Sequence, residues 1–336
     1  MEKPPGPPRS PTGASAETPD GFLGDDVYAI DTRLSGHPGV TSAYLVAGSA
    51  PCLVETGTAT SAPQVEAALT ALGIGHDDLA TIVVTHIHLD HAGGVGHLAA
   101  VYPKAQIVVH RAGARHLVDP SRLMASARRV FGDVVIDRVF GDLHATADDR
   151  VRPLDHGDTV DLGHGRRLTA LDSPGHARHH LGLLDSVTGD LYVGDAAGLW
   201  FNDTAEVRPA TPPPEFDLAA ALDSLRRFAA AAPTRLLFSH FGPADDPATT
   251  LAHAAEELQL WVDEVAALRG SGSPADLDHA LEAVGSRDRA RYAALRSDLD
   301  RATQIDQLSS TRANLAGVWR WLDNHPGPMG YGLPVE

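Results

Sequence analysis

The feature that most constrains this 336-residue chain is a cluster of metal-binding side chains directly after a short apolar segment. Residues 81–84 are β-branched or apolar, which predicts a strand. The next residues include His86, His88, Asp90 and His91 within six positions. If the extended geometry continues, the imidazoles of His86 and His88 point to the same side. Imidazole and carboxylate groups suit zinc, so the cluster predicts a zinc site at the end of a strand.

Three later residues are candidates for completing this site. His176, Asp195 and His240 each follow a segment that is predicted to be a strand, and each lies close to glycine or proline. Loops at the ends of strands commonly carry functional side chains on a rigid scaffold. We therefore predict that these three residues join the cluster as ligands.

Extended and helical patterns alternate along the chain before residue 247. Short apolar runs predict strands at Val27–Asp31, Ser42–Ala47, Pro51–Val54, Thr81–Val84, Gln106–Val109, Arg167–Leu171, Leu181–Leu184, Leu191–Val193 and Arg235–Phe238. Helical spacing of apolar residues predicts helices at Pro63–Leu72, Gly94–Val101 and Leu218–Ala231. This alternation is typical of a layered α/β fold.

Composition divides the chain into three parts. Residues 1–20 are rich in proline, glycine and serine and predict a disordered leader. Residues 21–247 predict a catalytic domain with a helical insertion at about 112–142, and residues 248–336 predict a helical C-terminal region. An apolar stripe between Ile305 and Leu322 is expected to pack on the catalytic domain and to roof the metal cleft.

Charge and composition restrict the partners. The net charge of −17 argues against nucleic acid and against an anionic membrane surface, because both require basic surfaces. The chain has one cysteine, Cys52, and no run of about 18 apolar residues. No Gly-x-Ser-x-Gly motif or P-loop lysine is present. We expect a cytoplasmic protein with a small-molecule substrate, and the sequence is compatible with a homodimer.

The segment from Thr85 to Gly93 resembles the H-x-H-x-D-H signature of the metallo-β-lactamase superfamily. The resemblance extends over about Val27 to Gly242 and includes hydroxyacylglutathione hydrolases and lactonases among the similar members. It implies an αββα four-layer sandwich, here with a helical C-terminal extension. It also implies two metal positions with a shared carboxylate: His86, His88 and His176 for one ion, Asp90, His91 and His240 for the other, and Asp195 between them.

Several residues differ from the family pattern, and these differences argue against some substrate classes. Glu55 stands where many members have aspartate, and the resemblance implies that Glu55 and His180 orient ligands without binding metal. The bridging Asp195 and the absence of a cysteine ligand argue against β-lactam hydrolysis. No lysine follows Lys104, which argues against the usual recognition of glutathione, and no tyrosine shortly follows Asp195, unlike the lactonases.

The resulting prediction is a dinuclear zinc hydrolase that cleaves an ester, thioester or lactone with a hydroxide bridging two zinc ions. Asp90 is the predicted catalytic residue, because it binds metal and can accept the proton of the nucleophile. Iron or manganese are alternative metals. Two other functions remain open on the same fold: a mononuclear iron sulfur (persulfide) dioxygenase and a non-catalytic metal-binding protein.

Overall fold

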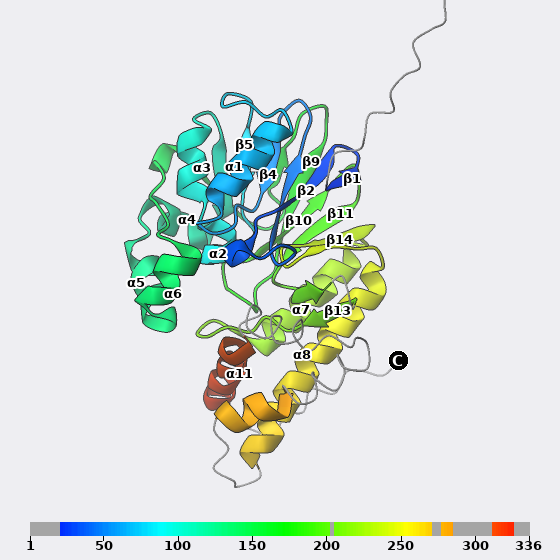
Figure 1. The fold of residues 1–336 in the computed structure, drawn as a ribbon. Coiled ribbons are helices and arrows are strands. Elements are labelled where there is room, and N and C mark those ends of the chain that lie inside the picture. Colours follow the sequence, from blue (N-terminus) through cyan, green and yellow to red (C-terminus); the bar gives the residue numbers. More distant parts are fainter. Residues whose placement is uncertain (1–20, 202–204, 271–276, 285–310, 326–336) are drawn as a thin grey trace, which may run out of the picture.

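A computed structural model describes residues 21–201, 205–270, 277–284 and 311–325 of the chain (Figure 1). The leader predicted for residues 1–20 lies outside the described residues. The described part contains two large sheets that pack face to face, with helices on both outer sides (Figure 1). This is the αββα sandwich that the sequence predicts.

The first sheet has seven strands in sequence order. Its strands are β1 (Phe22–Gly24), β2 (Val27–Asp31), β3 (Ser42–Val46), β4 (Cys52–Val54), β5 (Thr81–Val83), β6 (Gln106–His110) and β7 (Val151–Leu154). Strands β1 to β4 are antiparallel, whereas β4 to β7 are parallel. Because β4, β5 and β6 run parallel, their carboxyl ends lie at the same edge of the sheet.

The second sheet has six strands in the order β15-β14-β11-β10-β9-β8. Its strands are β8 (Thr159–Asp161), β9 (Arg167–Asp172), β10 (Leu181–Asp185), β11 (Asp190–Gly194), β14 (Arg235–Phe238) and β15 (Gly242–Ala244). A separate hairpin consists of β12 (Leu199–Phe201) and β13 (Glu206–Arg208). Sequence patterns did not predict β1, β7, β8, β12, β13 and β15. These strands have three or four residues, and most of them contain no run of three apolar residues, so nothing distinguishes them from loops.

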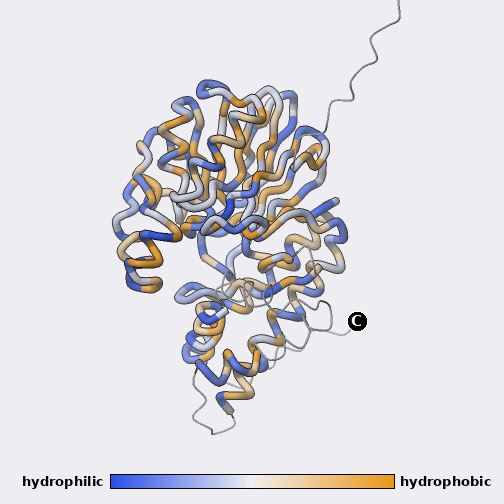
Figure 2. The backbone as a smooth tube through the Cα atoms, in the orientation of Figure 1, coloured by the Kyte–Doolittle hydropathy of each residue, from blue (hydrophilic) through white to orange (hydrophobic). Residues whose placement is uncertain are grey.

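The side chains of single strands alternate between different hydrophobic layers, as the two-residue period of a strand requires. In β3, Tyr44 and Val46 pack between the two sheets, whereas Leu45 packs under the helices of the first sheet. In β14, Leu237 packs between the sheets, whereas Leu236 and Phe238 face the helices of the second sheet. Three buried clusters therefore separate four layers, and the hydrophobic residues follow these layers (Figure 2).

Helices before and within the predicted insertion cover the first sheet (Figure 1). They are α1 (Ala62–Ala71), α2 (Leu89–Ala92), α3 (Val95–Val101), α4 (Arg111–Val118), α5 (Ser121–Phe131), α6 (Asp133–Val135) and the π-helical turn η2 (Ile136–Phe140). Single 3-10 turns occur at η1 (Leu34–Gly36) and η3 (Asp148–Arg150). The 112–142 segment is thus helical.

The outer face of the second sheet shares one hydrophobic cluster with α7 (Leu218–Ala230), α8 (Pro247–Gly270), α11 (Thr311–Asn324) and helical residues 277–284, and α11 packs on α8, away from the sheet (Figure 1). In the predicted C-terminal stripe, Leu315, Val318 and Leu322 are buried against this layer, whereas Ile305 and Leu308 lie outside the described residues. Among the described helices, none combines the length and the apolar composition that crossing a bilayer requires.

Candidate metal centre

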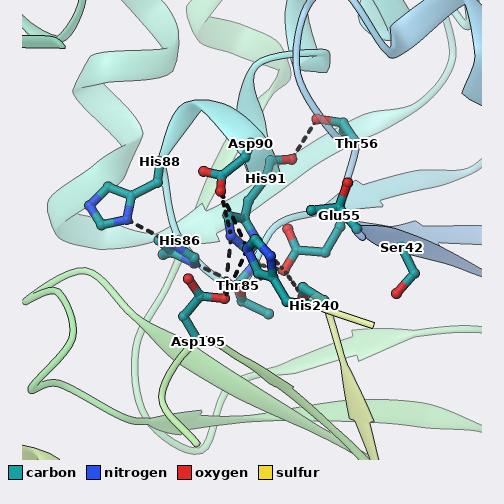
Figure 3. Close-up of polar contacts among 12 residues, drawn as sticks. Ser42, Glu55, Thr56, Thr85, His86, His88, Asp90, His91, Asp195 and His240 are labelled. Carbon is teal, nitrogen blue, oxygen red and sulfur yellow. Dashed lines mark hydrogen bonds and ion pairs between the residues drawn. The ribbon is translucent and has the colours of Figure 1, made fainter. Parts of the chain in front are cut away.

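The seven predicted ligands come together at one end of the sandwich, although they come from four separate loops. Figure 3 labels six of them, and His176 lies beside His88 and Asp195. The His86–His91 cluster follows β5 and continues into α2. His176, Asp195 and His240 follow the ends of β9, β11 and β14, respectively. The carboxyl ends of β5, β11 and β14 therefore bring together side chains that are more than 150 residues apart (240 − 86 = 154).

The first group of ligands is formed by three histidines, His86, His88 and His176, whose ring nitrogens lie close together. Nε2 of His86 is 3.0 Å from Nδ1 of His88, and Nε2 of His176 is 2.8 Å from the same Nδ1 atom. The other ring nitrogen of His176 donates a hydrogen bond to the Ala210 carbonyl at 2.9 Å. This bond leaves Nε2 of His176 with a lone pair directed at its neighbours, as a metal-binding histidine requires.

The second group is formed by Asp90, His91 and His240. Oδ2 of Asp90 is 3.3 Å from Nε2 of His240 and 3.7 Å from Nε2 of His91. Asp195 lies between the two groups and uses a different oxygen toward each. Its Oδ1 is 3.4 Å from His91 and 3.7 Å from His240, and its Oδ2 is 3.6 Å from His176.

These residues fit a pair of metal ions on two grounds. First, ligand atoms placed about 2.1 Å from a tetrahedral ion lie about 3.4 Å apart, which falls inside the observed range of separations. Second, both ring nitrogens of His91 and Oδ1 of Asp195 are buried without a hydrogen-bond partner. Such unsatisfied polar atoms are costly to bury, and a cation between Nε2 of His91 and Oδ1 of Asp195 would satisfy both of these atoms, whereas Nδ1 of His91 faces Glu55.

The electrostatics of the pocket favour the same arrangement. Burial and the neighbouring histidines His91 and His88 hold the pKa of His86 well below its usual value. Burial raises the pKa of Asp195, but the histidines His91 and His240 outweigh it, and the pKa lies well below the usual range. The neutral His86 imidazole and the ionised Asp195 carboxylate are the forms that bind metal. Burial lowers the pKa of His91, but the carboxylates Asp195 and Asp90 outweigh it and raise the pKa well above its usual value, so a positive charge is favoured between these carboxylates.

Glu55 lies behind the two ligand groups and contacts both of them (Figure 3). Its Oε1 accepts a short hydrogen bond from the Thr85 hydroxyl, whose oxygen is 3.0 Å from Nδ1 of His86. The same Oε1 accepts from Ser239 at 3.2 Å and lies 3.7 Å from Nδ1 of His91, which is longer than a hydrogen bond. Glu55 thus acts on His86 through Thr85 and on His91 by charge.

The backbone at Glu55 also indicates a functional constraint. Its φ angle is +68°, a left-handed conformation that is strained for a residue with a β-carbon. The side chain is 1% exposed. Backbone strain at a buried charged residue is typical of a site whose geometry the surrounding fold imposes.

We expect Glu55→Gln to lower the affinity for metal by roughly ten- to a hundredfold, because the charge that orients His86 and His91 is lost. Metal content after dialysis against graded chelator measures the effect. Glu66→Gln is the matched control, since Glu66 contacts only a surface histidine, His97, at 2.8 Å. Unchanged metal affinity in Glu55→Gln would show that Glu55 does not support the ligands.

His180 contacts Asp195 through the backbone amide of Asp195. Its Nε2 accepts a hydrogen bond from the Asp195 amide at 3.1 Å, and its Nδ1 is 2.7 Å from the Ser173 hydroxyl. Gly194 makes this contact sterically feasible, because a β-carbon there would lie 2.5 Å from Nε2 of His180. His180 therefore fixes the loop that presents Asp195.

Three supporting groups were missed in the sequence. Thr85 and Ser239 each stand one residue before a predicted ligand, and a hydroxyl in that position is a recognisable signal. The hydrogen bond from His176 to the Ala210 carbonyl could not be predicted from the sequence, because every residue has a backbone carbonyl. The loop that contains Ala210 is held in turn by α11: the Thr211 amide donates to Oδ1 of Asn314 at 2.8 Å.

A cavity of about 310 Å³ opens directly onto the ligands. His88, Asp90, His176, Asp195 and His240 all line it, as do Ala313 and Asn314 of α11. The C-terminal helix therefore contributes to the wall of the site, which agrees with the expected roof. A volume of this size is at the lower end of the range for small-molecule sites.

Comparisons with known proteins agree with this geometry. The model of the metallo-β-lactamase superfamily matches residues 36–240. A metallo-β-lactamase fold-containing protein of Sulfurisphaera tokodaii is 36% identical over 196 residues, which cover 56% of this chain and 71% of that protein. A hydroxyacylglutathione hydrolase of a Synechococcus strain is 31% identical over 199 residues, which cover 59% of this chain and 64% of that protein.

Solved structures show the same fold. An archaeal metallo-β-lactamase superfamily protein from Sulfolobus tokodaii matches with a TM-score of 0.63 and 24% identity, covering 87% of this chain and 98% of that one. A metallo-β-lactamase family protein from Thermus thermophilus matches with a TM-score of 0.63 and 22% identity, covering 90% and 95%. Since the family model spans more than half of the sequence, the chain belongs to the metallo-β-lactamase superfamily and is a metal-dependent hydrolase.

Proposed function

We propose that the protein is a dinuclear zinc hydrolase of a small ester, thioester or lactone. The observation that carries this proposal is the position of Asp195, whose two oxygens face different ligand groups at 3.4 and 3.6 Å. A carboxylate placed in this way suits two cations better than one. When bound, two such ions lower the pKa of water toward neutrality and polarise a carbonyl oxygen.

The residues of this chain supply the remaining requirements of hydrolysis. The Asp90 carboxylate is partly exposed and lines the cavity, so it can reach a water molecule there. We assign it as a ligand that also accepts the proton given up by the attacking water. The cavity walls from α5, α11 and the 210–214 loop limit access of bulk water to the reacting group.

Thioesters are a supported subset of the proposed substrates. Two of the related sequences, from Synechococcus strains, are named hydroxyacylglutathione hydrolases, and they are 31% and 30% identical to this chain. The matched region spans 64% of each of these relatives. Their similarity supports acyl transfer to water as the reaction class.

We expect about two zinc ions per chain in protein purified without chelator, since two ligand groups share one carboxylate. Dialysis against chelator is expected to abolish hydrolysis of acyl esters and thioesters, and added zinc is expected to restore it. Elemental analysis and activity on the same samples provide the measurement. One iron per chain, with oxygen-dependent turnover of a persulfide, would replace this proposal by the dioxygenase alternative.

A further inference from the structure

The cavity over the ligands extends along an apolar helix face. The ligands named above line one part of it, and residues of α5 line another part. Leu123, Ala127, Val130 and Phe131 of α5 all line the cavity, and Phe140 of η2 extends the same surface. These α5 positions recur at helical spacing, so they share one side of the helix. The apolar wall is therefore continuous with the reaction site.

Two features show that this wall is unusual for a protein surface. Val130 and Phe131 are 52% and 38% exposed, although both are large apolar residues on a helix. Arg122 and Ser126 also line the cavity and form a polar border on one side of the same helix. An exposed apolar strip with a polar border, open to a site with metal ligands, is typical of a binding surface.

We infer that the substrate is an ester, thioester or lactone whose acyl group is an apolar alkyl chain, and that this chain lies against α5. The inference rests on the proposed hydrolase function. An apolar cavity of about 150 Å³ holds one benzene molecule, so the observed volume has room for on the order of twelve non-hydrogen atoms. A reacting carbonyl with a chain of about eight carbons fits this limit.

The alkyl chain is chosen over other apolar groups because of the shape of the wall. Leu123 and Val130 present aliphatic side chains, the small Ala127 lies between them in the sequence, and these positions follow one side of the helix. A chain that follows this strip buries its methylenes while the carbonyl stays at the metal centre. Each buried methylene is expected to raise kcat/KM by about fourfold until the cavity is filled.

The first test is a chain-length series of 4-nitrophenyl esters, from acetyl to dodecanoyl, on zinc-loaded protein. We expect kcat/KM to rise up to an acyl chain of about eight carbons and then to level. Calorimetric binding of octanoate and butyrate gives a second readout that does not require turnover, and octanoate is expected to bind at least about tenfold more tightly. Equal binding together with a flat chain-length profile would overturn the inference.

Matched variants at Val130 in α5 and Val134 in the following helix, α6, locate the chain. Val130→Asp places a charge on the cavity wall at a half-exposed position, so folding is expected to persist. It should lower kcat/KM for the octanoyl ester by at least about thirtyfold and for the acetyl ester by less than about threefold. Val134→Asp is the control, because Val134 is 65% exposed and does not line the cavity.

A second pair tests the length of the cavity. Ala127→Phe fills the middle of the strip, and the preferred acyl chain should become shorter by several carbons. Ala125→Phe on the exposed side of α5 should leave the preference unchanged. Equal effects of Val130→Asp and Val134→Asp, accompanied by a change in oligomeric state, would overturn the inference and assign the strip to contact with a second copy of the chain.

The outcomes separate this inference from the proposed function. If zinc-loaded protein hydrolyses no ester, thioester or lactone, the proposed function fails, and tight octanoate binding that Val130→Asp abolishes would still support an alkyl-binding cavity. If short and long acyl esters are hydrolysed equally well, the proposed function stands and the inference fails.

Discussion

Asp90→Asn is expected to lower kcat for ester and thioester hydrolysis by at least about a hundredfold. Asn keeps the size and shape of the side chain but removes its negative charge. The Oδ2 atom of Asp90 lies 3.3 Å from His240 and faces the cavity, so the change removes both a charged ligand and the proposed proton acceptor. Steady-state kinetics on variant protein with measured metal content tests this expectation.

Two controls keep the result interpretable. Asp77→Asn removes a carboxylate that pairs with Lys104 on the surface at 3.3 Å, and it is expected to leave kcat unchanged. Thermal unfolding of Asp90→Asn shows whether the fold persists. Near-normal turnover by a folded, metal-loaded Asp90→Asn protein would show that another group accepts the proton.

Trp261→Ala is expected to lower the free energy of unfolding by about 3–5 kcal/mol. Trp261 is 1% exposed in α8 and belongs to the hydrophobic cluster that α8 shares with α7, α11 and the outer face of the second sheet. The substitution removes a large apolar side chain and leaves a cavity where neighbours from sheet and helix meet. Denaturant unfolding followed by far-UV circular dichroism measures the loss.

Leu260→Ala is the matched control, because Leu260 precedes Trp261 in the same helix and is 45% exposed. Its expected cost is below about 1 kcal/mol. The comparison also bears on the predicted boundary at residue 247. A small cost for Trp261→Ala would mean that α8 is a removable appendage, whereas a large cost means that the sheet needs α8 to cover its outer face.

The sequence could indicate the candidate ligands because their residue types and spacing are typical of a metal site. Four metal-binding side chains within six residues have few structural explanations, and His176, Asp195 and His240 each follow a readable strand. Strands that contain runs of apolar residues were found for the same reason, even where the run is short, as in β4 and β5. The strands β8 and β15 have only three residues each, and their position at the edges of the sheet comes from pairing.

The sequence by itself determined the residue types of the candidate metal centre, the layered α/β class, and the helices of the 112–142 segment and of the described residues after 247. Only the tertiary structure decided which side chains meet across the chain. Asp195 separates two groups of ligands, Asn314 holds the loop behind His176, and α5 forms one wall of the cavity. These contacts join distant segments, and local periodicity contains no information about which distant surfaces pack together.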